Sequence, residues 1–301
     1  MTRLCERQGL SVDAACRLFG HSRQAYYQSK TDYAERYRRE ALVIQAAREI
    51  REQDMRIGGY KLWVMLRDMF DEGWVPGRDS FYALLDRWCL TLPRPKPRHT
   101  TNSNHRFRTY KNIYREIVPT RPNEVWVADI TYVGLEDGCC YLHLITDAYS
   151  HMIVGWCLSD SLMAVFTLSA LRMAIGQTGK DDLTGLVHHS DRGTQYCCRD
   201  YVDELKRHNI IISMTEDYKP TDNAIAERAN GIIKQELIYP RKCFSNICQA
   251  KAMIASFIEF YNFKRPHMSI GMQVPAAVHK GQTGEQKKMW KNKVYVKTSM
   301  E

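Results

Sequence analysis

The chain has 301 residues, 44% hydrophobic and 26% charged, which are the proportions of a globular protein with a sizeable core and one to three domains. Its formal charge of +9 indicates a polyanionic partner, and no apolar run approaches the roughly 18 residues needed to span a bilayer, so we expect no membrane partner. The first residues lack the apolar core of a secretion signal, so we expect a cytoplasmic protein whose ten cysteines are reduced and buried; none forms a CxxC pair typical of zinc sites.

The sequence pattern of residues 2–29 predicts three short helices. Ser11 is suited to cap a helix over residues 12–19, Gly20 to make a turn, and Ser22 to cap the third helix. A short helix, a glycine turn and a polar second helix form the helix-turn-helix pattern, so we predict DNA contacts from Arg23 and Gln24 in the third helix. The alternative is a small helical bundle without DNA contact.

Further helices are expected over residues 33–52, 61–70 and 80–88, so that residues 1–90 form an all-α, helix-turn-helix-like DNA-binding region. Residues 91–116 follow as a linker, since Pro93, Pro95 and Pro97 bar a regular helix.

The linker is also strongly basic. Between Arg87 and Arg115 there is no Asp or Glu but there are eight Lys and Arg residues. We favour contact with the phosphate backbone of DNA over a solvated linker with incidental charge. The predicted contacts are Arg94, Lys96, Arg98, Arg106 and Arg108.

From Asn123 the pattern changes to mixed α/β. Three strand-like runs (125–133, 140–147, 151–158) precede a helix (162–175), a strand (183–189), a helix (199–208), a short strand (210–214) and two helices, one ending near Ile238 and one over 246–263. The order β-β-β-α-β-α-β-α predicts an antiparallel meander leading into parallel crossovers. It matches a ribonuclease-H-like, mixed-sheet catalytic core over residues 117–280, followed by a basic tail over 281–301.

Three acidic residues stand out within this core. Asp129 lies inside an apolar strand, Asp191 follows another apolar run, and Glu227 lies in a helix with 35 residues between it and Asp191. An uncompensated carboxylate in a strand interior costs several kcal/mol, which favours a functional role for Asp129. Carboxylates on two strands and a helix can hold two divalent metal ions, the apparatus that cuts and joins phosphodiesters.

Any one of these acids could instead be a turn or cap residue, as we expect for Asp147, Asp217 and Asp222, the last as the cap of the Glu227 helix. Lys234 lies seven residues after Glu227, two turns along the same helix face, where it would bind a DNA phosphate. The alternative is a plain surface lysine.

Several motifs together resemble one known family. They are Gly59-Tyr60, Trp126-Val-Ala-Asp129-Ile-Thr-Tyr132, His189-Ser-Asp191-Arg-Gly-Thr-Gln-Tyr196, Asp222-Asn-Ala-Ile-Ala-Glu227, Lys234-Gln-Glu-Leu237 and Tyr261-Asn-Phe-Lys-Arg-Pro-His267. The chain is similar, over about residues 10–275, to bacterial insertion-sequence transposases that have a retroviral-integrase-like core and are encoded in two overlapping reading frames. It resembles the downstream-frame product.

The resemblance implies that Asp129, Asp191 and Glu227 are the DDE ligands of Mg²⁺ or Mn²⁺, two ions per active site. It implies metal-dependent nicking at the ends of a DNA element and attack of the freed 3′-hydroxyl on target DNA. Arg265 and His267 of the last motif join the predicted DNA contacts. Expected partners are the element ends and target DNA, further copies of the chain, and the upstream-frame product; a DNA-bound protein would be associated with the nucleoid.

Two other functions fit part of the pattern. One is a non-catalytic helix-turn-helix DNA-binding protein derived from a transposase; decay would most cheaply appear as a lost acid, and all three acids remain. The other is a ribonuclease-H-like nuclease acting on RNA–DNA hybrids. The acidic spacing and the basic linker favour the integrase-type reaction.

Overall fold

The computed structural model describes residues 11–92, 109–216 and 223–282. The chain divides into two compact units, Met1–Ile50 with Leu62–Thr91, and Arg51–Lys61 with Leu92–Glu301. The predicted boundary near residue 90 is therefore close to one of the junctions, but the short segment Arg51–Lys61 belongs with the second unit. None of the described helices is long and apolar enough to cross a membrane.

The first unit is helical. Helix α2 (Val12–Leu18) begins at Ser11, whose Oγ accepts a hydrogen bond from the Ala14 amide, as predicted. Gly20 has a φ of +67°, the left-handed conformation in which glycine carries no steric penalty. The chain then turns into α3, and Ser22 Oγ accepts from the Ala25 amide at 3.0 Å.

Helix α3 differs from the prediction because it is one continuous helix, Arg23–Gln53. The prediction of two separate helices in this segment, a short third helix and another over residues 33–52, is therefore wrong. The polar residues between them are suited to a helix start, but neither Gly nor Pro interrupts the segment, so nothing in it prevents the helix from continuing. The predicted first helix, over residues 2–8, lies outside the described residues.

Two shorter helices follow: α4 (Gly59–Met69), which belongs to the first unit from Leu62 on, and α5 (Arg78–Arg87). Their apolar faces bury Leu62, Leu66, Phe81 and Leu84, and α3 contributes Ile44 to the buried residues of this unit. The Trp63 indole donates to the Pro76 carbonyl at 2.9 Å and so fixes the loop between the two helices.

The second unit contains a five-stranded mixed sheet. Its strands are β1 (Val125–Leu135), β2 (Gly138–Asp147), β3 (Ile153–Ser159), β4 (Val187–Ser190) and β5 (Ile211–Met214), in the spatial order β3-β2-β1-β4-β5. Strands β1, β2 and β3 pair antiparallel, whereas β4 is parallel to β1 and β5 is parallel to β4. An antiparallel meander followed by parallel crossovers confirms the predicted ribonuclease-H-like fold.

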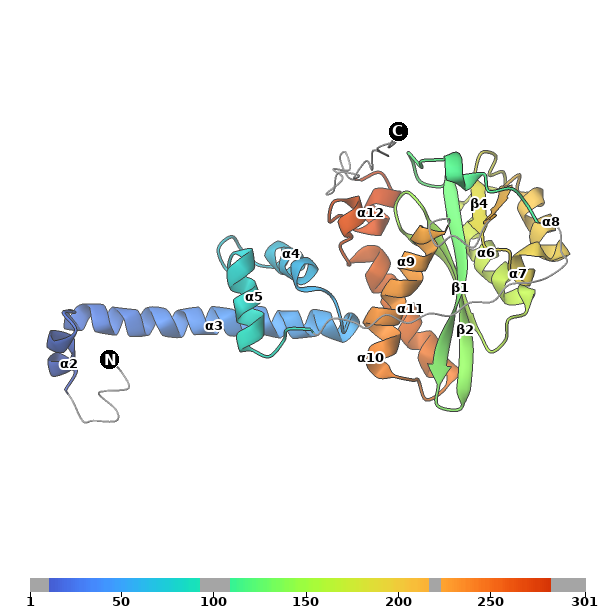
Figure 1. The fold of residues 1–301 in the computed structure, drawn as a ribbon. Helices are drawn as coiled ribbons and strands as arrows, with labels where there is room; N and C mark the ends of the chain where they lie inside the picture. The colour runs from blue at the N-terminus through green and yellow to red at the C-terminus, as the bar shows by residue number, and fades with distance from the viewer. Residues whose placement is uncertain (1–10, 93–108, 217–222, 283–301) are drawn as a thin grey trace, which may run out of the picture. The chain divides into compact units, whose positions relative to one another are not determined.

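Helices cover both faces of this sheet (Figure 1). On one face lie α6 (Ala164–Thr178), α7 (Thr194–Cys197) and α8 (Arg199–Arg207), which share a core with Trp126, Ala128 and Ile145. On the other lie α9 (Ala224–Ile233), the π-helix η2 (Lys234–Ile238) and α11 (Ile247–Phe263), which pack on Val133, Leu142 and Leu144. Alternate residues of β1 and β2 thus point into two cores.

The predicted elements of the core occur within a few residues of their expected bounds. The largest shift is at β4, which starts at Val187 rather than at residue 183, because Gly185 takes a φ of +92° and the Leu186 amide bonds to the Leu183 carbonyl. The short helices α7, α10 (Tyr239–Arg241) and α12 (Pro275–His279) and the 3₁₀ turns η1 (Tyr114–Glu116) and η3 (Met268–Ile270) were not predicted.

The end of the basic linker is held on the core. Ser213 Oγ on β5 accepts hydrogen bonds from the amides of Ile113 and Tyr114 at 3.0 and 3.1 Å, and Glu216 accepts one from the Asn112 amide.

The nine described cysteines are free thiols. The expectation of burial is wrong for four of them, Cys89, Cys139, Cys243 and Cys248, which are exposed.

Candidate active site

The register of two central strands brings Asp129 and Asp191 together. The parallel ladder of β1 and β4 pairs Val127 with His189, two residues before Asp129 and Asp191 respectively. The two acids lie near each other, because the charge of Asp191 acts on the carboxyl of Asp129. Strand β4 ends at Ser190 while β1 continues, and Asp191 is therefore the first residue beyond the carboxyl end of β4. Carboxyl ends of parallel strands are the usual position of ligand sites in open α/β sheets.

Asp129 is held by two hydrogen bonds in a partly buried position. Its Oδ1 accepts from the Ile130 amide at 2.8 Å, and its Oδ2 accepts from Asn230 Nδ2 at 2.6 Å. Burial, and then the negative charge of Asp191, raise the pKa of Asp129 to about 6, although Asn230 and the positive charge of Lys234 act in the opposite direction. Two carboxylates thus share a small volume in which a cation would be stabilised.

Asp191 is fixed by the turn that follows it. Its Oδ1 accepts a hydrogen bond of 2.9 Å from the Gly193 amide. A Cβ at Gly193 would lie 2.9 Å from that same oxygen, closer than real Cβ contacts, and 3.0 Å from Gln195 Oε1, a tight contact. The glycine in the Asp-Arg-Gly sequence thus lets the carboxylate approach the backbone this closely, and a larger residue would have to displace it.

Helix α9 docks on β1 through two asparagines. Asn223 Nδ2 donates to the Ala128 carbonyl at 3.1 Å, and Asn230 donates to Asp129. Asn223, Glu227 and Asn230 occupy positions i, i+4 and i+7, so Glu227 lies on the same side of the helix as the two asparagines, at the exposed edge of the buried face. The predicted cap Asp222 lies outside the described residues, and Asn223, the residue before α9, makes no side-chain cap hydrogen bond.

Glu227 is an exposed residue. The protein around its carboxyl nevertheless removes part of its hydration, which raises its pKa. Within residues 11–92, 109–216 and 223–282, no three His, Cys, Asp or Glu side chains lie close enough together to hold a metal ion. The structure thus brings Asp129 and Asp191 together and leaves Glu227 outside their immediate group.

The donor set nevertheless fits a hard divalent cation. Carboxylate oxygens are the ligands that Mg²⁺ prefers, and Mg²⁺ commonly takes only one or two carboxylates, with water and substrate oxygens filling its other positions. Burial, and then the charge of Asp191, disfavour the ionised form of Asp129, and a divalent cation held by both carboxylates would favour it.

Lys234 belongs to the same electrostatic group. It opens the π-helical turn η2 that continues α9, it is partly buried, and its charge lowers the pKa of Asp129. The predicted placement of Lys234 on the side of the helix near the acids is consistent with this interaction.

Three residues near the acids were missed in the sequence. Asn223 and Asn230 attach α9 to β1, and the buried Tyr196 lies near enough to Asp191 and Asp129 that both charges raise the pKa of its hydroxyl. The only signal for Asn230 is its i+3 spacing from Glu227, which places it on the same helix face.

Apart from Lys234, the predicted DNA contacts divide into three groups. Arg23 and Gln24 are exposed at the start of α3. The linker residues Arg94, Lys96, Arg98, Arg106 and Arg108 lie outside the described residues. Arg265 and His267 are only 1% and 4% exposed, so neither side chain reaches the surface for DNA, and a direct contact from either is a wrong prediction for this conformation.

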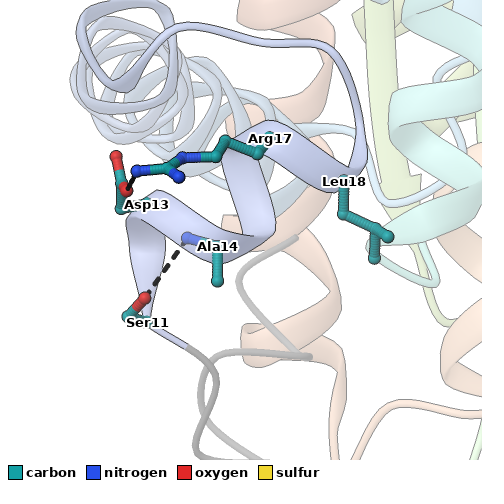
Figure 2. Close-up of a pocket in the computed structure, with 5 residues that line it drawn as sticks. All are labelled: Ser11, Asp13, Ala14, Arg17 and Leu18. Atoms are coloured by element: carbon teal, nitrogen blue, oxygen red, sulfur yellow. Dashed lines mark hydrogen bonds and ion pairs between the residues drawn. The ribbon is translucent and has the colours of Figure 1, made fainter.

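A shallow surface hollow lies along α2 in the first unit (Figure 2). Its lining consists of Ser11, Asp13, Ala14, Arg17 and Leu18. The polar groups in it are already engaged with each other, since Arg17 Nη2 pairs with Asp13 Oδ2 at 2.5 Å and Ser11 Oγ with the Ala14 amide at 3.2 Å. None of the three acids contributes to it.

Comparisons with known proteins point in the same direction as this geometry. Two models of an integrase core domain match residues 119–220 and 208–275. An insertion element IS600 uncharacterized 31 kDa protein from Shigella sonnei is 34% identical over 87% of this chain and 96% of its own length. A transposase for insertion sequence element IS629 from Shigella sonnei is 32% identical over 74% of this chain and 73% of its own.

A solved structure, the HTLV-2 integrase catalytic core domain in complex with magnesium, is 22% identical over 53% of this chain and 98% of its own, with a TM-score of 0.43. That score is too low to support any argument.

Proposed function

The chain belongs to the insertion-sequence transposases with an integrase core domain, and we propose that Asp129, Asp191 and Glu227 are the metal-binding acids of its DNA strand-transfer reaction. The reaction is nicking at the ends of a DNA element, followed by attack of the freed 3′-hydroxyl on a target phosphodiester. The observation that supports the proposal is the parallel pairing of β1 with β4, which ends two residues before Asp129 and Asp191, together with the effect of the Asp191 charge on Asp129.

Asp129, Asp191 and Glu227 would hold two Mg²⁺ or Mn²⁺ ions. Asp129 is the most firmly placed of the three acids, because a central strand and two hydrogen bonds fix it. When bound, the ions would stabilise charge on the attacking and leaving oxygens of the phosphodiester. Glu227 lies one turn before Asn230, at the exposed edge of the buried face of α9, and its flexible side chain would turn toward the other two acids.

Lys234 is proposed as the phosphate-binding group. Its ammonium acts near Asp129, so it can hold a DNA phosphate next to the acids and keep the Asp129 carboxylate ionised. The exposed Arg23 and Gln24 are proposed to contact the element ends, and the five basic linker residues to contact the phosphate backbone.

DNA, as element ends and as target, is the principal partner. Further copies of this chain and the product of an upstream reading frame are the additional partners that we propose. Sedimentation of the chain with end DNA measures how many copies of the chain assemble on it. The same measurement with the upstream product added shows whether that product joins the complex.

The test uses a labelled oligonucleotide carrying one element end, in Mg²⁺. We expect Asp129→Asn, Asp191→Asn and Glu227→Gln each to abolish nicking and strand transfer while leaving DNA binding, followed by fluorescence anisotropy, within a few-fold of wild type. Asp160→Asn, an exposed acid just beyond β3, is the matched control and should stay active. Strand-transfer products from any of the three acid variants would contradict the assignment.

The same assay separates the other candidate functions. A non-catalytic DNA-binding protein would bind the end DNA and give no products with the wild-type chain. A ribonuclease-H-like nuclease would cut an RNA–DNA hybrid in preference to the DNA end.

A further inference from the structure

Four charged side chains form a buried cluster in the second unit. They are Asp54, just after helix α3, Lys61 in the first turn of α4, Glu236 in η2, and Arg265, just after α11. Asp54 is fully buried, Arg265 is 1% exposed and Glu236 is 8% exposed. All four belong to the same compact unit, because that unit includes the segment Arg51–Lys61.

The centre of this cluster is a two-point ion pair. Arg265 Nε and Nη2 donate to the two carboxylate oxygens of Glu236, each at 2.7 Å. Arg265 Nε also lies 3.4 Å from Asp54 Oδ2, and Lys61 Nζ lies 3.6 Å from Glu236 Oε1. A planar guanidinium bonded at two points fixes the orientation of its partner, which a single contact does not.

Asp54 is the third member of the cluster, beside Arg265. Burial, and then the charge of Glu236, raise its pKa to about 8, whereas the charge of Arg265 acts in the opposite direction. Asp54 Oδ1 accepts from the Arg56 amide at 3.2 Å, which holds the backbone of the 51–61 segment.

Such a cluster is a poor means of gaining stability. Desolvation of buried ions offsets most of their attraction, and apolar residues of the same volume often stabilise a fold as well or better. The cluster therefore calls for a reason other than stability, and its position supplies one.

Glu236 and Lys234 lie two residues apart in the same π-helical turn. Such turns are rare, occur often at functional sites, and change the rotation of the residues that they contain. Glu236 faces the interior and Arg265, whereas Lys234 acts on Asp129. Anchoring the Glu236 carboxylate at two points consequently also fixes the direction in which Lys234 leaves the helix.

We propose that Glu236 and Arg265, supported by Asp54, are positioning residues that hold the η2 turn in the rotation presenting Lys234 to the acidic site. The inference rests on the proposed strand-transfer function. It gives Arg265, which cannot reach DNA, a role in catalysis that acts through Lys234.

The test is a double-mutant cycle in the full-length chain with Arg265→Lys and Lys234→Ala. Arg265→Lys keeps the charge but cannot make the two-point bond. We expect each single variant to lower the rate of strand transfer at saturating DNA by roughly 10- to 100-fold, since small displacements at a reacting centre have effects of this size. Arg265→Lys should cost little further in the Lys234→Ala background, because residues that act through one another are not additive.

Full additivity of the two losses, or an unchanged rate in a folded Arg265→Lys chain, would overturn the proposal. Arg172→Lys is the matched control: Arg172 pairs with Glu204 at 2.9 Å on α8, and its small effect should add to that of Lys234→Ala. Asp54→Asn, which keeps the acceptor for the Arg56 amide, should retain more activity than Asp54→Ala.

A variant with an apolar cluster covers the case in which Arg265→Lys fails to fold. Glu236→Leu and Arg265→Met, combined with Lys61→Met and Asp54→Leu, replace the whole cluster by apolar residues, leave no unpaired buried charge, and are expected to fold. A lowered strand-transfer rate in this folded chain supports the positioning role, and a wild-type rate contradicts it. Failure of the acid assignment is separate, since it would show as activity of Asp129→Asn.

Discussion

Asn230 on α9 donates a 2.6 Å hydrogen bond to the carboxylate of Asp129 on β1. This bond fixes one of the two acids and attaches the helix that carries Glu227. We predict that Asn230→Ala lowers the strand-transfer rate roughly 10- to 100-fold, measured at saturating end DNA, because the Asp129 carboxylate loses its orientation.

The matched control for that change is Asn223→Ala. Asn223 docks the same helix but donates to a backbone carbonyl, so its loss should lower the melting temperature more than the strand-transfer rate. Equal effects of the two variants on rate and on melting would contradict a specific role for Asn230.

Gly193→Ala should inactivate the enzyme. The added Cβ would lie 2.9 Å from Asp191 Oδ1 and displace the carboxylate that the Gly193 amide holds. Strand-transfer assays should show at least a tenfold loss. Gly231→Ala in α9 has nothing within 4 Å of the new Cβ and should be active and as stable as wild type or slightly more so. An active Gly193→Ala enzyme would mean that Asp191 works from another position.

Gly155→Ala tests packing rather than chemistry. Gly155 lies on β3 under helix α6, and a Cβ there would meet the Ala170 carbonyl oxygen at 2.2 Å. We expect a loss of about 1–3 kcal/mol or more in the free energy of unfolding, measured by urea denaturation. Gly176→Ala, at an open position of α6, is the control and should be neutral or slightly stabilising.

Stability should fall as the pH is lowered through a buried histidine. His143 is 1% exposed, its ring nitrogens lie 3.1 Å from Ser159 Oγ and 2.8 Å from Thr167 Oγ1, and burial lowers its pKa to about 4. A depressed histidine pKa contributes stability that is complete above the unfolded value of about 6.5 and is lost as the pH falls toward 4. Its contribution has an upper limit of about 3 kcal/mol.

The measurement is the melting temperature of wild type and His143→Gln between pH 4 and pH 8. The variant should melt lower at pH 8 and lose less stability on acidification. Parallel curves for the two proteins would show that His143 does not contribute to the pH dependence.

The core was the most predictable part of the molecule. Alternating apolar runs and turn residues such as Glu136-Asp-Gly138 are local signals, and the strands β1, β2 and β3 occur where these signals placed them. The proximity of Asp129 and Asp191 was predictable for the same reason, since Asp129 lies inside one apolar strand pattern and Asp191 follows another.

Arg265 illustrates what sequence could not provide. Its partners Glu236 and Asp54 come from distant segments, and nothing local marks an arginine next to a lysine as buried. The π-helical turn at Lys234 is equally hidden, because it depends on a shift of backbone hydrogen bonds that residue preferences do not specify.

The parallel register of β1 and β4 also determines where this molecule tolerates change. The separation of Asp129 from Asp191 depends on strand pairing, and the length of chain that connects the two strands does not affect it. Extra residues at the Asp137-Gly138 hairpin would therefore leave the distance between the acids unaltered, and that turn is a suitable point for inserting a tag or a reporter domain. A deletion within β4 would shift Asp191 to the opposite face of the sheet and remove it from the site.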